Sequence, residues 1–266
     1  MNKKLMIIGL VMGLLFACNK KQDDAADPNI NDIVVARKNT ALLNKLTATW
    51  CAPCGSWGWM LNEELIELTG DKAITFSMYN STNSLFFTKT SVDLVSGFSP
   101  FQGWPTFYVN GSNKNALVEG GISYSGTKTA CVNAVNDFAE LIPIANTGFV
   151  SQFKGDQLSV FTKTVFFKTQ DTNEQFYLSA YLIENNVLGA QKGKPEEVPH
   201  PHVLRAGMTE NTFGIPIDVE AVTGNEFTYT FTATPDPGWK RENLYVITII
   251  WRKNGDKYEF VNASRG

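Results

Sequence analysis

Apolar and polar positions in the first half of the chain alternate between the repeat of a strand and the repeat of a helix. The predicted strands cover residues 41–49, 72–80, 105–111 and 115–121, and the predicted helices cover residues 52–69, 84–98 and 125–142. Gly70 is expected to end the first helix, Ser84 to cap the second and Pro143 to stop the third. Elements in this order predict an α/β domain around one sheet, over residues 33–145.

Beyond residue 145 the helical repeat disappears, and short strands separated by turn residues take its place. The predicted strands cover residues 158–169, 174–185, 226–234, 244–253 and 257–264. Asn254 and Gly255 are a two-residue hairpin signal between the last two strands. The pattern predicts an all-β domain over residues 146–266, an antiparallel sandwich that is immunoglobulin-like in outline. A β-barrel would give the same pattern, so both architectures stay open.

The N-terminal residues have the pattern of a lipoprotein signal peptide. Lys3 and Lys4 precede an apolar run over residues 5–17, which is short for a membrane span and ends directly before Cys18. The sequence Leu-Phe-Ala-Cys resembles a bacterial lipobox, in which the cysteine receives diacylglycerol and becomes the first mature residue. Residues 1–17 are therefore predicted to be removed and Cys18 to anchor the protein to a membrane. The alternative is an ordinary secretory signal with an incidental cysteine.

The mature chain is predicted to be acidic. The full sequence holds 23 Lys and Arg against 26 Asp and Glu, and removing residues 1–17 takes away two lysines, which leaves 21 minus 26, or −5. Nucleic acids require clustered basic charge, so this balance argues against a nucleic-acid partner. Residues 18–32 are polar and aperiodic and predict a flexible tether. The charged residues 20–24 resemble a signal for export to the outer face of the outer membrane, and a solvated linker would have the same composition.

Two cysteines with two residues between them, Cys51 and Cys54, are the strongest candidates for chemistry. The helix is predicted to open at Cys51, where free backbone N–H groups and the helix dipole stabilise a thiolate. Pro53 suits the first helical turn because it has no N–H to satisfy. Cys51 is then expected to attack a disulfide and Cys54, one turn deeper, to resolve the product. Half of a zinc site and an inert structural disulfide are the alternatives.

The sequence Thr-Trp-Cys-Ala-Pro-Cys resembles the active site of the thioredoxin superfamily. The superfamily's second motif, a cis-proline followed by a strand and a turn, resembles the stretch that begins at Trp104 and Pro105, fifty-one residues after Cys54. The resemblance covers about residues 33–142 and implies a cis Trp104–Pro105 peptide that faces the disulfide. The substrate-binding residues that it implies are Trp50, Ala52, Pro53, Trp104 and Pro105. The redox-active disulfide would then serve without a further cofactor and without a metal.

The whole layout resembles the 28-kilodalton outer-membrane lipoprotein family, with a lipobox, a tether, a thioredoxin-like domain and a β-sandwich that contains residues 200–207. This resemblance implies a location more than a reaction. The location is the outer membrane of a Gram-negative bacterium, on its periplasmic face or at the cell surface. Thioredoxins usually carry a buried acid six residues before the first cysteine, and here that place holds Lys45, which is expected to face solvent. The usual proton acceptor for Cys54 is therefore missing.

Several other side chains near these motifs could contribute to a site. The tryptophans expected around the disulfide, as an apolar patch for a partner peptide, are Trp50, Trp57, Trp59 and Trp104. Trp57 and Trp59 cannot face the same way on a helix, so at least one of them is expected in the core. Cys131 is expected to be a buried small hydrophobe. His200 and His202 could bind a metal, although a loop feature is the favoured interpretation.

The sequence therefore predicts a lipid-anchored, monomeric cell-envelope protein that exchanges thiols and disulfides with protein or peptide substrates outside the cytoplasm. The competing hypothesis is a non-enzymatic binding lipoprotein that uses the thioredoxin fold as a scaffold.

Overall fold

The computed structural model describes residues 26–266. The predicted signal peptide, the lipidation site Cys18 and the charged residues 20–24 lie outside the described residues. Within residues 26–266, no helix combines the length and the apolar character needed to cross a membrane.

The described residues form a mixed α/β structure. The elements before residue 145 are η1 (Ile30–Asp32), β1 (Ala41–Leu46), α1 (Ala52–Gly55), α2 (Trp57–Thr69), η2 (Gly70–Lys72), β2 (Ala73–Met78), α3 (Lys89–Gly97), β3 (Thr106–Val109), β4 (Ser112–Asn113), β5 (Ala116–Val118), β6 (Gly121–Ser123) and α4 (Tyr124–Ala139). Those that follow are β7 (Ala145–Lys154), β8 (Gln157–Phe166), β9 (Gln175–Glu184), β10 (Val187–Ala190), β11 (Glu197–His200), β12 (Val203–Gly207), β13 (Ile215–Pro216), β14 (Glu226–Ala233), η3 (Arg241–Asn243), β15 (Leu244–Asn254) and β16 (Lys257–Arg265).

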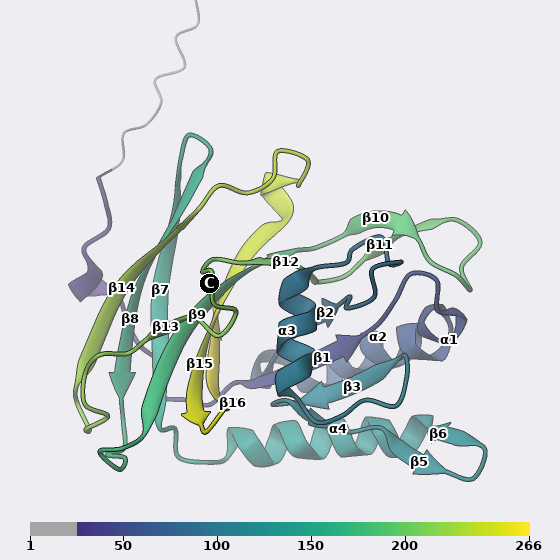
Figure 1. Cartoon of the computed structure of the whole chain (residues 1–266), viewed down its shortest axis with the longest axis horizontal. Coiled ribbons are helices and arrows are strands. Elements are labelled where there is room, and N and C mark those ends of the chain that lie inside the picture. Colours follow the sequence, from purple (N-terminus) through teal and green to yellow (C-terminus); the bar gives the residue numbers. More distant parts are fainter. Residues whose placement is uncertain (1–25) are drawn as a thin grey trace, which may run out of the picture.

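One nine-stranded sheet runs through most of the molecule, in the order β16-β15-β9-β12-β2-β1-β3-β4, with β13 paired to β9 (Figure 1). The pairs β1–β2 and β2–β12 are parallel, and the other pairs in this sheet are antiparallel. Strands from both predicted domains therefore share this sheet, and they join where Val203 of β12 lies opposite Ser77 of β2. The division into residues 33–145 and 146–266 stays a prediction.

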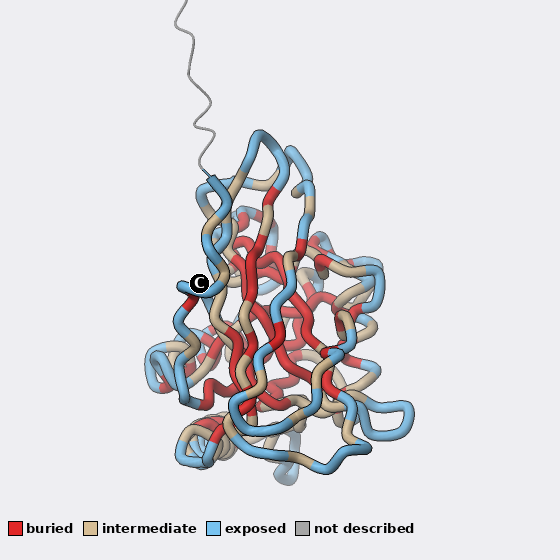
Figure 2. The backbone as a smooth tube through the Cα atoms, turned by 90° about the vertical axis from the view of Figure 1, so that its left-hand side faces the viewer, coloured by how far each residue is buried: buried red, intermediate tan, exposed pale blue. Residues whose placement is uncertain are grey.

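Side chains pack on both faces of the large sheet. On the β1–β3 part, α2 and α4 cover the face that carries Leu43 and Phe107, and α3 lies against the face that carries Leu42 and Phe76. On the other part, a second sheet of order β14-β8-β7 packs across an apolar core onto β9, β15 and β16. Figure 2 shows the buried positions running through the middle of the strands, with exposed positions at the loops.

The predicted helices differ from the structure in three places. The third helix ends at Ala139, four residues before Pro143. The helix expected over residues 52–69 is interrupted at Ser56, whose backbone (φ −98°, ψ −104°) separates α1 from α2. The second helix begins five residues later than Ser84, and Thr88 caps it by accepting a hydrogen bond from Ser91 N at 3.0 Å. Ser84 has another role, because its buried hydroxyl accepts a hydrogen bond from Thr49 N at 3.1 Å, next to the cysteine pair.

The sequence pattern missed several strands. The first part of β7 is buried on both faces and therefore does not alternate between apolar and polar residues. The segment predicted as one strand over residues 115–121 belongs to the hairpin β5–β6. The hairpin β10–β11 was also missed, because each of its strands has only four residues.

We call residues 187–200, which comprise this hairpin and its loop, the arm. In Figure 1 the arm extends from the end of the β-rich half towards α1.

A buried ion pair lies where the two halves of the large sheet meet. Arg205 of β12 donates to Glu184 of β9 through Nε and Nη2, each 2.7 Å from Oε2, and the side chains are 16% and 3% exposed. The other carboxylate oxygen accepts a hydrogen bond from Lys240 N at 2.9 Å. The Arg205 guanidinium also lies over the rings of Phe86 and Trp239, so the pair connects both halves of the chain.

Glu184→Gln is expected to lower the free energy of unfolding by about 3 kcal/mol or more, because it leaves the Arg205 charge buried without its counter-charge. Chemical denaturation checks this. The control is Asp71→Ala at the exposed Lys38–Asp71 pair, which should change stability by less than about 1 kcal/mol. Equal effects of the two substitutions would contradict a structural role for the buried pair.

Candidate functional site

Cys51 and Cys54 form a disulfide at the beginning of α1, with their Cα atoms 5.3 Å apart. β1 ends at Leu46, and the turn that follows brings Cys51 to the N-cap position, where Sγ accepts a hydrogen bond from Cys54 N at 3.2 Å. Cys51 retains a small exposed fraction of 5%, and Cys54 has none. Because α1 has only four residues, the nearby hydrogen-bond donors contribute more to the electrostatics of Cys51 than an extended helix dipole does.

The Trp104–Pro105 peptide is cis, as predicted, and lies beside the disulfide. The Trp104 carbonyl oxygen is 3.6 Å from Cys51 Sγ, and a disulfide sulfur has no hydrogen to donate, so this is a contact without a hydrogen bond. Gly58 of α2 makes the close approach possible, because a Cβ there would lie 2.6 Å from Pro105 Cγ. The two motifs that the sequence singled out are therefore neighbours in space.

The four tryptophans divide into two groups. Trp50, which is 40% exposed, and Trp104 pack edge to face with ring centroids 5.1 Å apart, and Trp104 also packs against the buried cluster that contains Cys51 and Cys54. Trp57 lies against Phe107 in the core, and Trp59 is buried on another side of α2. Only Trp50 and Trp104 therefore flank the disulfide. Of the other predicted contact residues, Pro53 is exposed, Ala52 is half-buried and Pro105 is buried.

Lys45 is buried, so the expectation that it faces solvent is wrong. It is 3% exposed, and its Nζ lies 5.2 Å from the centroid of the Trp59 ring. The same ring contacts the Lys194 ammonium at 4.9 Å, and its Nε1 donates to Glu63 Oε1 at 2.8 Å. Burial lowers the pKa of Lys45 to about 8; the Glu63 carboxylate opposes this shift and the Lys194 ammonium adds to it. No sequence pattern indicated this environment, because Trp59 and Lys194 reach Lys45 from α2 and from the arm.

The arm lies directly on the turn that holds the cysteines. Lys192 N donates to Thr49 O at 2.7 Å, and the buried Gln191 side chain donates to Cys51 O at 3.0 Å. Gly55 of α1 permits this contact, since a Cβ there would overlap the Lys192 carbonyl oxygen. Sequence reasoning missed Gln191 and Lys194, because nothing in the spacing or periodicity of a loop near residue 192 indicates contact with residue 51.

Cys131 and the two histidines have separate surroundings in the described part of the chain. Cys131 of α4 is fully buried, and burial raises the pKa of its thiol to about 12. His200 pairs with Tyr79 OH and His202 with Tyr245 OH, each at 2.8 Å, so the two imidazoles have separate partners. In the described part of the chain, no group of three or more His, Cys, Asp or Glu side chains is placed to hold a metal ion.

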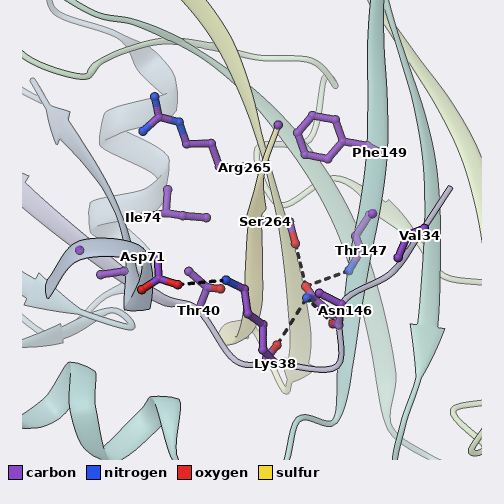
Figure 3. A pocket seen from close by; sticks show the side chains of 15 residues that line it. Val34, Lys38, Thr40, Asp71, Ile74, Asn146, Thr147, Phe149, Ser264 and Arg265 are labelled. Carbon is purple, nitrogen blue, oxygen red and sulfur yellow. Dashed lines mark hydrogen bonds and ion pairs between the residues drawn. The ribbon is translucent and has the colours of Figure 1, made fainter.

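A cavity of about 500 Å³ lies elsewhere, between the beginning of β2 and the β7–β16 edge (Figure 3). Its polar side chains largely bond to one another. Lys38 pairs with Asp71 at 3.7 Å, and Asn146 bonds to Ser264 and to the backbone of residue 38. No cysteine lines this cavity, so the candidate for chemistry remains the disulfide with its surrounding Trp50, Trp104 and arm.

Comparison with known proteins finds a solved structure with a similar fold and no matching protein family. The sequence matches no protein-family model and no curated protein. HBP35 of Porphyromonas gingivalis is structurally similar, with a TM-score of 0.68 at 17% identity, over 87% of this chain and 76% of that one. A domain of the outer membrane lipoprotein Omp28 from the same organism matches at a TM-score of 0.31 and 18% identity, over 47% of this chain and 88% of that one, which is too low to support an argument. The likeness to HBP35 shows the fold alone.

Lys45→Met is expected to remove a rise in stability at alkaline pH. The folded-state pKa of about 8 lies below the ordinary lysine pKa of 10.5, so between these values the unfolded chain binds more protons and stability rises with pH. The rise attributable to Lys45 is about 3 kcal/mol in total. Denaturation of both proteins at pH 7 and pH 10.5 measures it, with Lys253→Met as a control for the loss of one exposed charge. An identical pH slope in wild type and Lys45→Met would contradict the buried placement.

Proposed function

We propose that this protein is a thiol–disulfide oxidoreductase in which Cys51 attacks and Cys54 resolves. The observation that carries the proposal is the Cys51–Cys54 disulfide at a strand-to-helix turn, with the cis Trp104–Pro105 peptide beside it. A crosslink over so short a loop restricts the unfolded chain very little, so it contributes little to stability. A chemical role accounts for the pair better than a structural one.

The exchange proceeds in two balanced steps. In the reduced protein the Cys51 thiolate attacks one sulfur of a client disulfide, which forms a Cys51–client bond and releases the other client sulfur as a thiolate. The Cys54 thiolate then attacks Cys51 Sγ, which closes the Cys51–Cys54 bond and releases the second client thiolate. The client gains two electrons and the protein loses two, and a dithiol donor must reduce the protein again. The same steps in reverse oxidise a client dithiol.

The substrates in this proposal are extended segments of proteins or peptides outside the cytoplasm. Trp50 is partly exposed beside Cys51, and the Trp104 backbone passes within 3.6 Å of its sulfur. A client strand would pair with the Trp104 backbone while Trp50, Ala52 and Pro53 contact its side chains. The apolar rings of Trp50 and Trp104 suit a peptide surface. No cofactor beyond the disulfide is part of the proposal, and the protein would act as a monomer.

The architecture in this proposal is a thioredoxin-like domain followed by an antiparallel β-sandwich. Helices on both faces of the β1–β3 strands support the first part, and the apolar core between the β14-β8-β7 sheet and the large sheet supports the second. The fold likeness to HBP35 over 87% of the chain is compatible with both. The pattern of residues 1–32 supports signal-peptide cleavage, lipidation at Cys18 and a location in the cell envelope at the outer membrane.

A non-enzymatic binding lipoprotein is the second candidate. Lys45 is buried where thioredoxins usually carry an acid, and a lysine that stays protonated cannot accept a proton from Cys54. Cys51 itself is only 5% exposed. Resolution by Cys54 is therefore proposed to be slow, and a scaffold role would follow if exchange were absent.

Cys54→Ser is expected to accumulate mixed disulfides with envelope proteins, because it retains the attacking thiol and lacks the resolving one. Non-reducing electrophoresis of membranes from cells that make the variant would detect these adducts. Alkylation of the reduced wild-type protein at neutral pH should label Cys51 first and leave the buried Cys131 unlabelled.

The matched controls are Cys131→Ser, which should behave as wild type, and Cys51→Ser/Cys54→Ser, which should form no adducts. The oxidoreductase proposal fails if Cys54→Ser traps no more protein than the double variant and if the Cys51 thiol titrates near the free value of about 8.5. The scaffold role would then stand.

A further inference from the structure

The arm brings one fully enclosed polar side chain to the cysteine turn. Gln191 is 3% exposed, although it belongs to a surface hairpin. Its Nε2 donates to Cys51 O at 3.0 Å, and it lies 3.3 Å from Ala48 O and 3.2 Å from Lys192 O. One carboxamide therefore binds both ends of the turn that leads from β1 into α1, across 140 residues of sequence.

Neighbouring contacts hold Gln191 in this position. Lys192 N donates to Thr49 O at 2.7 Å, which adds a backbone hydrogen bond between the arm and the same turn. Gly55 has no side chain where the Lys192 carbonyl oxygen lies, and Gly193 approaches Ala52 O closely. These contacts hold the arm against α1 and keep Gln191 beside the turn.

The hydrogen bonds of Gln191 bear on the charge of Cys51. Its NH₂ group donates to backbone carbonyls of the turn, Gly55 N also donates to Cys51 O at 3.3 Å, and Cys54 N donates to Cys51 Sγ at 3.2 Å. Donors close to a thiolate favour the charged form, and a fixed backbone keeps Sγ next to Cys54 N. These effects operate in a buried place, where electrostatic interactions are less screened than at the surface.

We propose that Gln191 is a positioning residue of the redox site, which holds the Ala48–Cys51 turn and so keeps Cys51 Sγ next to Cys54 N, the donor that stabilises the thiolate. This inference rests on the proposed thiol–disulfide exchange. It assigns a function to the arm, which supplies the side chain from the second half of the chain. Gln191 touches no substrate in this role and acts through Cys51.

The test uses the full chain in its reduced form and three variants. Gln191→Glu replaces the donor by a carboxylate that the carbonyl groups of Ala48, Cys51 and Lys192 repel, and Gln191→Met keeps the volume without a donor. Leu188→Glu, at a 57% exposed position of β10, places a new carboxylate on the arm away from the turn. The measurement is the pH dependence of alkylation at Cys51, mapped by peptide mass, together with the thermal midpoint of unfolding.

Gln191→Glu is expected to raise the pKa of the Cys51 thiol by about one unit, which lowers the thiolate fraction at neutral pH by up to about tenfold. Gln191→Met should raise the pKa by less, and Leu188→Glu should leave it unchanged. The proposal is overturned if both Gln191 variants titrate as Leu188→Glu does. If Gln191→Glu does not fold, Gln191→Met alone decides between these results.

The two proposals can fail separately. An unchanged Cys51 pKa in the Gln191 variants, together with client adducts in Cys54→Ser, would remove the role of Gln191 and leave the exchange reaction. A shifted pKa without any client adduct would keep the Gln191 contact as a determinant of thiol reactivity and remove the oxidoreductase function.

Discussion

A single parallel pairing, between β2 and β12, connects the two halves of the large sheet. Val203 lies opposite Ser77, and Ser77 N donates to His202 O at 2.7 Å. Because Ser77 is near the end of β2, β12 begins at the carboxyl end of the parallel strands. The turn that follows β1 and carries Cys51 lies at this same end, so the chain that enters β12 must pass close to the disulfide.

The arm follows from this connection. β9 ends at Glu184 and β12 begins at Val203, and both are neighbours within the sheet, so the residues between them project from its edge as a hairpin. The hairpin packs against α1 and contributes Gln191 and Lys194 to the surroundings of the cysteines. The Glu184–Arg205 ion pair lies where the arm leaves the sheet and links β9 to β12. The candidate site is thus assembled from both halves of the chain.

The local parts of this arrangement could be predicted from the sequence. The cysteine spacing, the position of Pro105 and the hydrophobic repeats correctly indicated a disulfide turn, a cis peptide and mixed α/β elements. Contacts between segments far apart in the chain could not be predicted, because a contact between Gln191 and Cys51 leaves no periodic signal in either segment. The prediction that Lys45 faces solvent failed for the same reason. A strand position six residues before a cysteine does not reveal that Trp59 and the arm will enclose it.

Helix boundaries show a second limit. Ser84 has the chemistry of an N-cap, yet its hydroxyl binds Thr49 N and the helix begins at Lys89. Hydrogen-bonding side chains of this type serve turns and caps equally well, so tertiary contacts decide between them.

The central claim is that the Cys51–Cys54 pair exchanges disulfides, and reduction of insulin by the purified full chain tests it most directly. With dithiothreitol as the electron donor, the account predicts that insulin precipitates sooner than with dithiothreitol alone, and that Cys51→Ser abolishes the difference. Precipitation at the same rate with wild type, with Cys51→Ser and with dithiothreitol alone would contradict the account.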